Sequence, residues 1–237
     1  VIDGPIWTPL GATSDDFGVT DLYASEDILV HGKIRTNGEI FASSSYGDIQ
    51  FDRPLVIRRP TGYTGYLSGY VNLSAGRDIL LPRKMVIRGG VRKSYPQAAA
   101  VEIYAVRDVQ LEDRVTIDTP GHFEGTSLKV SAGRSIIAKR SLDISTATGS
   151  PGLIELGPAC AIELTGSMIG TSPAGHVNRL IYVNSLTLAG ASLLGGTNAT
   201  NEVVCACIDT DQDQVCDGGC IYDPVGLATS QVMPPWQ

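Results

Sequence analysis

The sequence predicts an all-β protein whose chain winds into a single parallel β-helix of about seven coils, with non-repeat extensions at both ends. Three observations lead to this fold. Apolar and polar residues alternate over short stretches, which is typical of strands with one buried face. The same apolar spacing returns every 21–30 residues between positions 28 and 186. Gly, Asp and Ser separate the apolar stretches, as corners between strands require.

The repeat is clearest when the chain is aligned on one apolar position of each coil, which we call the anchor. The anchors are Ile28, Ile49, Ile79, Val109, Ile136, Ile162 and Leu186. Position +2 after each anchor holds Val30, Phe51, Leu81, Leu111, Ala138, Leu164 and Leu188. Position +6 holds Ile34, Leu55, Met85, Val115, Leu142, Met168 and Ser192. Position +8 holds Thr36, Ile57, Ile87, Ile117, Ile144, Gly170 and Leu194. Thr36, Gly170 and Ser192 are the clear exceptions to an apolar pattern.

Each coil is expected to contain three short strands. The first precedes the anchor and carries alternating pairs such as Leu73 and Ala75. The second contains the anchor and position +2, and the third contains positions +6 and +8. Such a unit cannot bury its inner face alone, so it must stack on copies of itself. At about 4.8 Å per coil, seven coils make a rod of roughly 34 Å.

The segments between the strands predict corners and loops. Gly76-Arg77-Asp78 and Gly133-Arg134-Ser135 precede their anchors and have turn-forming composition. The insertions at 59–70 and 90–98 are expected to loop out of the stack. No helical period separates the strands, which argues against an α/β fold. A sandwich or barrel stays open, but it does not explain the fixed register of the repeat.

Two phrases, LSAGRDILL (73–81) and VSAGRSIIA (130–138), resemble coils of the filamentous-haemagglutinin type of secreted bacterial surface protein. The resemblance covers about residues 22–195. It implies a right-handed β-helix and a role in adhesion or cell-surface structure. The coils of this chain are longer and less regular than the repeats of that family, so the resemblance supports the architecture more firmly than the biology.

Charge and hydropathy argue against two classes of partner. The formal net charge is −7, and phosphate recognition needs concentrated Lys and Arg, so we expect no nucleic-acid partner. No stretch approaches 18 uninterrupted apolar residues, so we expect no membrane span. The chain begins at Val1 without a leader pattern, which we interpret as a mature chain or an excised fragment.

Four of the five cysteines lie close together near the C-terminus, at Cys205, Cys207, Cys216 and Cys220. Their spacing differs from the paired knuckles of a zinc ribbon, so disulfides are favoured over zinc. Disulfides would place the protein outside a reducing cytosol, as a secreted or cell-surface protein. The pairing of these cysteines stays open. Cys160 is interpreted as a buried free thiol, with an intermolecular link as the alternative.

The same region contains an acidic loop, DTDQDQVCDGGC (209–220). Asp209, Asp211, Asp213 and Asp217 take relative positions 1, 3, 5 and 9, and the Val215 carbonyl takes position 7. Oxygens so placed can converge on Ca²⁺, which prefers six to eight oxygen ligands. The loop resembles thrombospondin type-3 repeats, dockerins and EF-hands. It departs from them at Gln214, where a Gly is expected, and at Cys220, where the last acid is expected. The alternative is a solvated acidic turn braced by disulfides.

Two groups of residues are candidates for cleaving or binding sugars. Asp48, Asp78 and Asp108 recur directly before their anchors, with Arg77, Arg107 and Arg134 beside them. Stacked carboxylates can serve glycoside cleavage, but residues that are repeated identically from coil to coil are better explained as structural residues of the corners. Tyr63, Tyr66 and Tyr70 are candidates for stacking on sugars. We therefore expect a non-enzymatic protein, with a polysaccharide-binding or polysaccharide-cleaving β-helix as the alternative.

The two ends of a β-helix expose unpaired backbone groups, which must be capped or will pair with another molecule. Trp7 and Trp236 lie in the segments outside the repeat. They either plug the ends of the core or dock on a neighbouring subunit. We expect a terminal segment at 1–20, the β-helix at 21–200 and a Cys- and Asp-rich extension at 201–237. The predicted function is an extracellular structural subunit that self-associates end to end, with host or cell-surface glycans as further partners.

Overall fold

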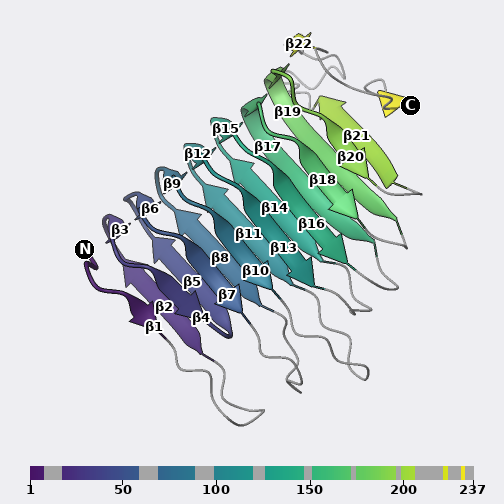
Figure 1. The fold of residues 1–237 in the computed structure, drawn as a ribbon. Helices are drawn as coiled ribbons and strands as arrows, with labels where there is room; N and C mark the ends of the chain where they lie inside the picture. The colour runs from purple at the N-terminus through teal and green to yellow at the C-terminus, as the bar shows by residue number, and fades with distance from the viewer. Residues whose placement is uncertain are drawn as a thin grey trace.

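The chain forms a parallel β-solenoid, as the repeat predicts (Figure 1). The structure is a computed structural model, and it describes residues 1–7, 18–58, 69–88, 99–119, 126–146, 151–171, 175–195, 199–205, 221–223 and 231–232. All regular structure in these residues is β-strand. The strands stack in about six turns, which is close to the seven coils expected.

The strands line up on three faces of the solenoid, and every pairing between them is parallel. Face 1 contains β2 (Val19–Ala24), β5 (Glu39–Ser44), β8 (Tyr70–Ala75), β11 (Ala100–Ala105), β14 (Ser127–Ala132), the first halves of β17 (Gly152–Leu164) and β19 (His176–Leu188), β21 (Ala199–Cys205) and β23 (Gln231–Val232). Face 2 contains β3 (Ile28–Val30), β6 (Ile49–Phe51), β9 (Ile79–Leu81), β12 (Asp108–Leu111), β15 (Ser135–Ala138), the second halves of β17 and β19, and β22 (Ile221–Asp223). Face 3 contains β1 (Ile6–Trp7), β4 (Ile34–Thr36), β7 (Leu55–Arg58), β10 (Met85–Arg88), β13 (Val115–Thr119), β16 (Leu142–Thr146), β18 (Met168–Thr171) and β20 (Leu193–Gly195).

The predicted anchors form one continuous column inside the solenoid. Each anchor from Ile28 to Leu186 pairs with the anchor of the next coil. All seven are almost completely buried, together with the apolar residues at positions +2, +6 and +8, except Leu194 of the last coil. Full burial of one such side chain stabilises a fold by about 1.5–3 kcal/mol. The stacked interior columns are therefore the main source of stability.

The predicted register fails in the last coil. Leu193, not Ser192, pairs with Met168 of the preceding coil, and Gly195, not Leu194, pairs with Gly170. One extra residue is accommodated at the corner before β20, where Gly190 has a φ of +74°. This left-handed conformation costs little only for a residue without a side chain. Ser192 therefore lies at the corner, where its hydroxyl is 3.0 Å from that of Ser167.

The first seven residues continue the solenoid ladders. Ile2 bridges to Val30 on face 2, and β1 pairs with β4 on face 3. Ile2 and Ile6 pack against the core from this first rung. Trp7 points away from the core and is 67% exposed. Trp7 therefore does not plug the end of the core. Its docking on a neighbouring subunit stays a prediction. Trp236 lies outside the described residues.

A buried histidine interrupts the apolar interior near the C-terminal end. His176 is 1% exposed, and its ring lies in space left by Gly152 and Gly170. A Cβ added to Gly170 would be 1.9 Å from ring carbons of His176. This close approach explains why a glycine interrupts the apolar pattern at position +8 of that coil.

Candidate functional site

The predicted metal and disulfide residues cannot be placed in the structure. Asp209, Asp211, Asp213, Val215, Asp217, Cys207, Cys216 and Cys220 lie outside the described residues. The backbone of Cys205 ends β21, but its side chain also lies outside the described part. The described ranges contain no group of three His, Cys, Asp or Glu side chains that could hold a metal ion. The calcium site and the disulfides stay predictions.

Cys160 is a free thiol that is half-buried. Its Sγ donates a hydrogen bond of 3.2 Å to the carbonyl oxygen of Gly133, in the neighbouring coil. The thiol expected from the sequence is therefore free but not fully buried.

The repeated Asp and Arg residues form a ladder along the corner between faces 1 and 2. Asp48 accepts hydrogen bonds from the Arg77 guanidinium at 2.8 and 3.0 Å and from the Asp78 backbone N–H at 3.1 Å. The pair Arg107 and Asp78 repeats this contact at 3.2 Å, and Arg134 pairs with Asp108 one coil further on. The ladder thus joins neighbouring coils and is not an acid–base pair.

The electrostatics of the ladder agree with a structural role. The hydrogen bond from Arg77 lowers the pKa of Asp48, and the hydrogen bond from Arg134 lowers the pKa of Asp108. A general acid in glycoside cleavage needs the opposite shift, because it must hold its proton until it is transferred. These carboxyls are instead held ionised.

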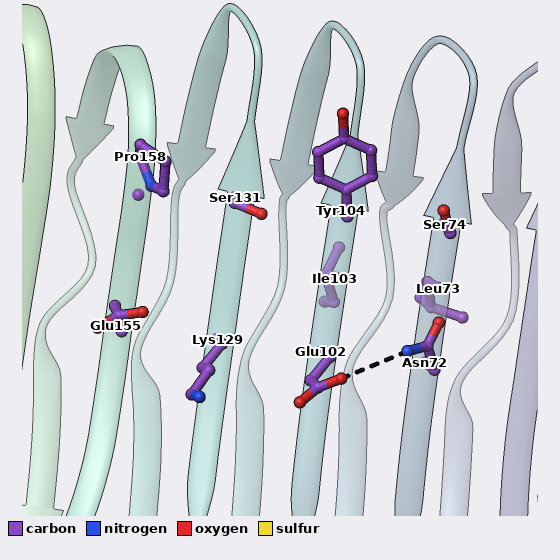
Figure 2. A pocket seen from close by; sticks show the side chains of 11 residues that line it. Asn72, Leu73, Ser74, Glu102, Ile103, Tyr104, Lys129, Ser131, Glu155 and Pro158 are labelled. Carbon is purple, nitrogen blue, oxygen red and sulfur yellow. Dashed lines mark hydrogen bonds between the residues drawn. The ribbon is translucent and has the colours of Figure 1, made fainter.

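A groove with non-repeated residues lies on the outer side of face 1. Its volume is about 340 Å³, and it crosses strands β8, β11, β14 and β17. It is lined by Asn72, Leu73, Ser74, Glu102, Ile103, Tyr104, Lys129, Ser131, Glu155, Gly157 and Pro158. Figure 2 shows Tyr104 between the hydroxyl groups of Ser74 and Ser131, with Glu102, Lys129 and Glu155 in a second row.

The second row of the groove belongs to a column of alternating charge. Glu102, Lys129, Glu155, Arg179 and Glu202 occupy the same position in five successive coils. Arg179 bridges Glu155 at 2.9 Å and Glu202 at 2.6 Å. Within the described residues, Lys129 forms no ion pair, although it stands between two glutamates. The column leaves one cation available inside the groove.

Tyr70 has a different role from the one expected. It was a candidate for stacking on sugars, but its hydroxyl donates a 2.7 Å hydrogen bond to Glu102 and its ring packs against Phe41, with centroids 5.4 Å apart. Tyr63 and Tyr66 lie outside the described residues. Tyr104, which the sequence analysis did not single out, is the exposed aromatic of the groove. The sequence signal for Tyr104 was its outward-facing position in β11, because the neighbouring strands carry serine at that position.

Glu102 and Glu155 are poorly placed for catalysis. They lie two coils apart, about 10 Å along the axis, with Lys129 between them. Glu102 accepts hydrogen bonds from Tyr70 and Asn72, and Glu155 is paired with Arg179. An exposed aromatic ring beside hydroxyl, amide and charged groups can instead stack on a sugar ring and bond its hydroxyls.

Comparisons with known proteins do not identify the chain. No protein-family model, curated protein or solved structure matches it. No described helix is long and apolar enough to cross a membrane. The function must therefore be argued from the fold and its surfaces.

Proposed function

We propose that the chain is an extracellular structural protein, a subunit of a filament or surface assembly built by end-to-end contact of β-solenoids. The main support for this proposal comes from the strand pairing at the N-terminal edge, which we define as Ile2, β1 and β2. Each of the three ladders begins there with a strand that has only one partner among the described strands. The proposal is independent of whether the assembly is an adhesin.

Among the described residues, the N-terminal edge combines backbone groups that lack a second strand partner with apolar side chains. Ile2, Ile6, Leu22 and Ala24 are only partly buried against the core. Trp7 and Tyr23 are exposed on the same rung, Tyr23 to 72%. Exposed parallel edges are templates for pairing with another chain. The last rung of a second copy presents the same three ladders in the same direction, so it is the natural partner.

A head-to-tail contact of this kind uses two different surfaces of each subunit. Such heterologous contacts form a closed ring only when the rotation between successive subunits leads back to the first subunit. A straight solenoid stacked end to end instead gives an open filament. The proposal therefore expects fibres whose long axis follows the solenoid axis.

Electron microscopy and light scattering of the purified chain test the proposal. The wild-type chain should form filaments, and Tyr23→Lys should shorten or abolish them because it places a charge on the edge. Tyr46→Lys is the matched control, because Tyr46 is equally exposed, to 73%, but lies one coil away from the edge. A wild-type chain that stays monomeric at all concentrations would falsify the proposal.

Two features are proposed to stabilise the C-terminal end of the subunit. Disulfides among Cys205, Cys207, Cys216 and Cys220 would suit the extracellular setting. Ca²⁺ held by the Asp209–Asp217 loop would neutralise its crowded carboxylates. Mass determination with and without reductant tests the disulfides. Melting with Ca²⁺ or with excess chelator tests the ion, and an unchanged melting temperature removes it from the proposal.

A second candidate function is carbohydrate binding by the face 1 groove. It is favoured by Tyr104, which stands in a column that otherwise carries serine, beside a row of charged groups. Calorimetry with cello-oligosaccharides and with polygalacturonate oligosaccharides should show binding that Tyr104→Ala removes and Tyr46→Ala keeps. New reducing or unsaturated ends in the same mixtures would show cleavage and contradict the non-enzymatic expectation.

A further inference from the structure

The outer side of face 3 carries a concentration of cations that the net charge of the chain conceals. We call it the basic face. It consists of eight residues on four successive coils, on the strands of face 3 or at the corner that leads into them: Lys33, Arg35, Arg53, Arg58, Arg83, Lys84, Arg88 and Arg114. All except Arg35 are exposed, and Arg35 is half-exposed. The chain as a whole has a net charge of −7.

The sequence around this face is almost free of carboxylates. Between Arg53 and Val101 the sole acidic residue is Asp78, which lies on the opposite corner and pairs with Arg107. The same stretch contains nine of the 18 Lys and Arg residues: Arg53, Arg58, Arg59, Arg77, Arg83, Lys84, Arg88, Arg92 and Lys93.

Some cations of the basic face are stacked on one another, and the column through Arg88 ends on the carboxylate of Asp118 in the next coil. Arg58 and Arg88 are direct neighbours in the parallel register of β7 and β10. Their backbones are about 4.8 Å apart, and like charges at such positions are destabilising. Within the described residues, Arg114 is the one member of the basic face that forms an ion pair, at 3.6 Å to Asp143. The other corner of the solenoid shows the contrast, since each Arg there has an Asp partner.

The carboxylates near the basic face mark its limits. Asp113 and Asp118 lie on the coil of Arg114, and Asp143 lies one coil further on. On the near side, Asp52 is engaged by His31 and Gln50. The basic face therefore spans four coils, or three steps from coil to coil, which is about 14 Å along the axis. The repulsion between these neighbouring cations is explained if an anion normally lies on the basic face.

We propose that the basic face binds a linear polyanionic polysaccharide, sulfated or carboxylated, that runs parallel to the solenoid axis. Columns of cations at one-rung spacing match a polymer with regularly spaced charges. Val56 and Val86 lie between these columns; Val56 is buried, and the half-buried Val86 gives an apolar contact for a sugar ring. Trp7 ends this central column and adds one aromatic ring for stacking.

Two other anions fit the basic face less well. Single-stranded nucleic acid is usually held by several aromatic platforms along a groove, and the described part of this face has one. The acid-rich segment 209–217 of a second copy carries four carboxylates, fewer than the eight cations of the basic face. Both alternatives are outcomes of the test below.

The test compares two double variants with the same change in charge. Arg58→Gln with Arg88→Gln removes the central stacked pair. Lys139→Gln with Arg140→Gln removes two exposed cations from the coil after Arg114, of which Lys139 pairs with Glu112. Binding of dextran sulfate, polygalacturonate, uncharged dextran and a single-stranded oligonucleotide is measured by calorimetry at several salt concentrations. Circular dichroism melting confirms that each variant is folded.

We expect dextran sulfate or polygalacturonate to bind more tightly than dextran and the oligonucleotide. The affinity should fall with salt, and the Arg58/Arg88 variant should bind about tenfold more weakly with a shallower salt dependence. The control variant should bind like the wild type. Equal loss in both variants, equal binding of uncharged dextran, or tighter binding of the oligonucleotide would overturn the proposal. Loss of filaments without any polysaccharide binding would assign the face to subunit contact instead.

Discussion

At the residue scale, the Asp–Arg ladder shows how one repeated pair can join every coil to the next. Asp48 and Asp78 each accept a hydrogen bond from the backbone N–H of the Asp one coil further on, and Asp48, Asp78 and Asp108 each pair with the Arg of the following coil. Asp108 is the most buried of these carboxylates, with a side chain that is 10% exposed. The repetition of this pair in successive coils favours a structural role over a single active site, and the ion pairs between coils agree with that role.

The ladder predicts a specific sensitivity to acid. Arg partners lower the pKa of Asp48 and Asp108 below the ordinary value of 3.8. Their contribution to stability is complete above that ordinary value and is lost as the pH falls through the lowered folded-state pKa. We expect Asp108→Asn to reduce the free energy of unfolding at neutral pH by about 1 kcal/mol, because the pair is partly screened by solvent.

Urea unfolding of Asp108→Asn at neutral pH and near pH 3 measures this effect. The variant should approach the wild type in stability at the acidic pH. Asp21→Asn is the control, because Asp21 is exposed on face 1. Equal destabilisation by both substitutions would contradict the role of the ladder.

His176 and Gly170 are predicted to be energetically coupled. A methyl group on residue 170 would overlap the imidazole ring of His176. Overpacking of this kind costs roughly 1–3 kcal/mol, so Gly170→Ala should be strongly destabilising. The same substitution should be tolerated in a His176→Ala background, where the ring is absent. A double-mutant cycle by urea unfolding measures the coupling. Additive effects would show that the glycine has another purpose.

At the element scale, the strands that recur in every coil were predictable and the irregular ones were not. Ile28, Ile79 and Ile136 lie in one column because period-2 alternation fixes which side of a strand is buried. Ile2 and Ile6 are too few to reveal that the first seven residues form a rung. The repeat aligns Tyr104 with Ser74 and Ser131, but it does not indicate that Tyr104, Lys129 and Glu155 line one hollow, because that depends on how three separate coils stack.

The last coil gives a direct test of register at the element scale. Leu193 is 4% exposed, whereas Leu194 is 44% exposed. We expect Leu193→Ala to reduce the free energy of unfolding by about 2–4 kcal/mol, since it leaves a cavity in the core. Leu194→Ala should change it by less than about 0.5 kcal/mol. Chemical unfolding of the two variants decides between this register and the alignment that placed Ser192 and Leu194 inside.

At the scale of the whole molecule, the interior changes character along the axis. One inward column on face 1 runs through Ile40, Val71, Val101, Leu128 and Ile154, and then continues as Asn178 and Asn201. His176 Nε2 is 2.9 Å from Oδ1 of Asn178, whose amide donates in turn to Asn201 and to the Leu194 carbonyl. Nδ1 of His176 is buried and has no hydrogen-bond partner among the described residues. The C-terminal coils therefore hold a polar layer where the middle coils are apolar.

This asymmetry predicts that acid opens the solenoid from its C-terminal end. Burial lowers the pKa of His176 below its ordinary value of 6.5. The unfolded chain then binds more protons than the folded chain, so stability falls as the pH drops below 6.5. In a solenoid each coil contacts only its neighbours, so a local loss of stability opens a few coils and not the whole molecule.

Hydrogen exchange measured by mass spectrometry at about pH 7.5 and about pH 5, with protection corrected for intrinsic exchange rates, tests this prediction. Protection of β19, β20 and β21 should decrease at the lower pH, while that of β8, β11 and β14 should hold. His176→Asn should remove the difference if it folds, since an amide has no proton to gain; His176→Gln serves as a second neutral variant. A uniform loss of protection along the solenoid would mean that its coils unfold as one cooperative unit, and the polar layer would then have no separate effect.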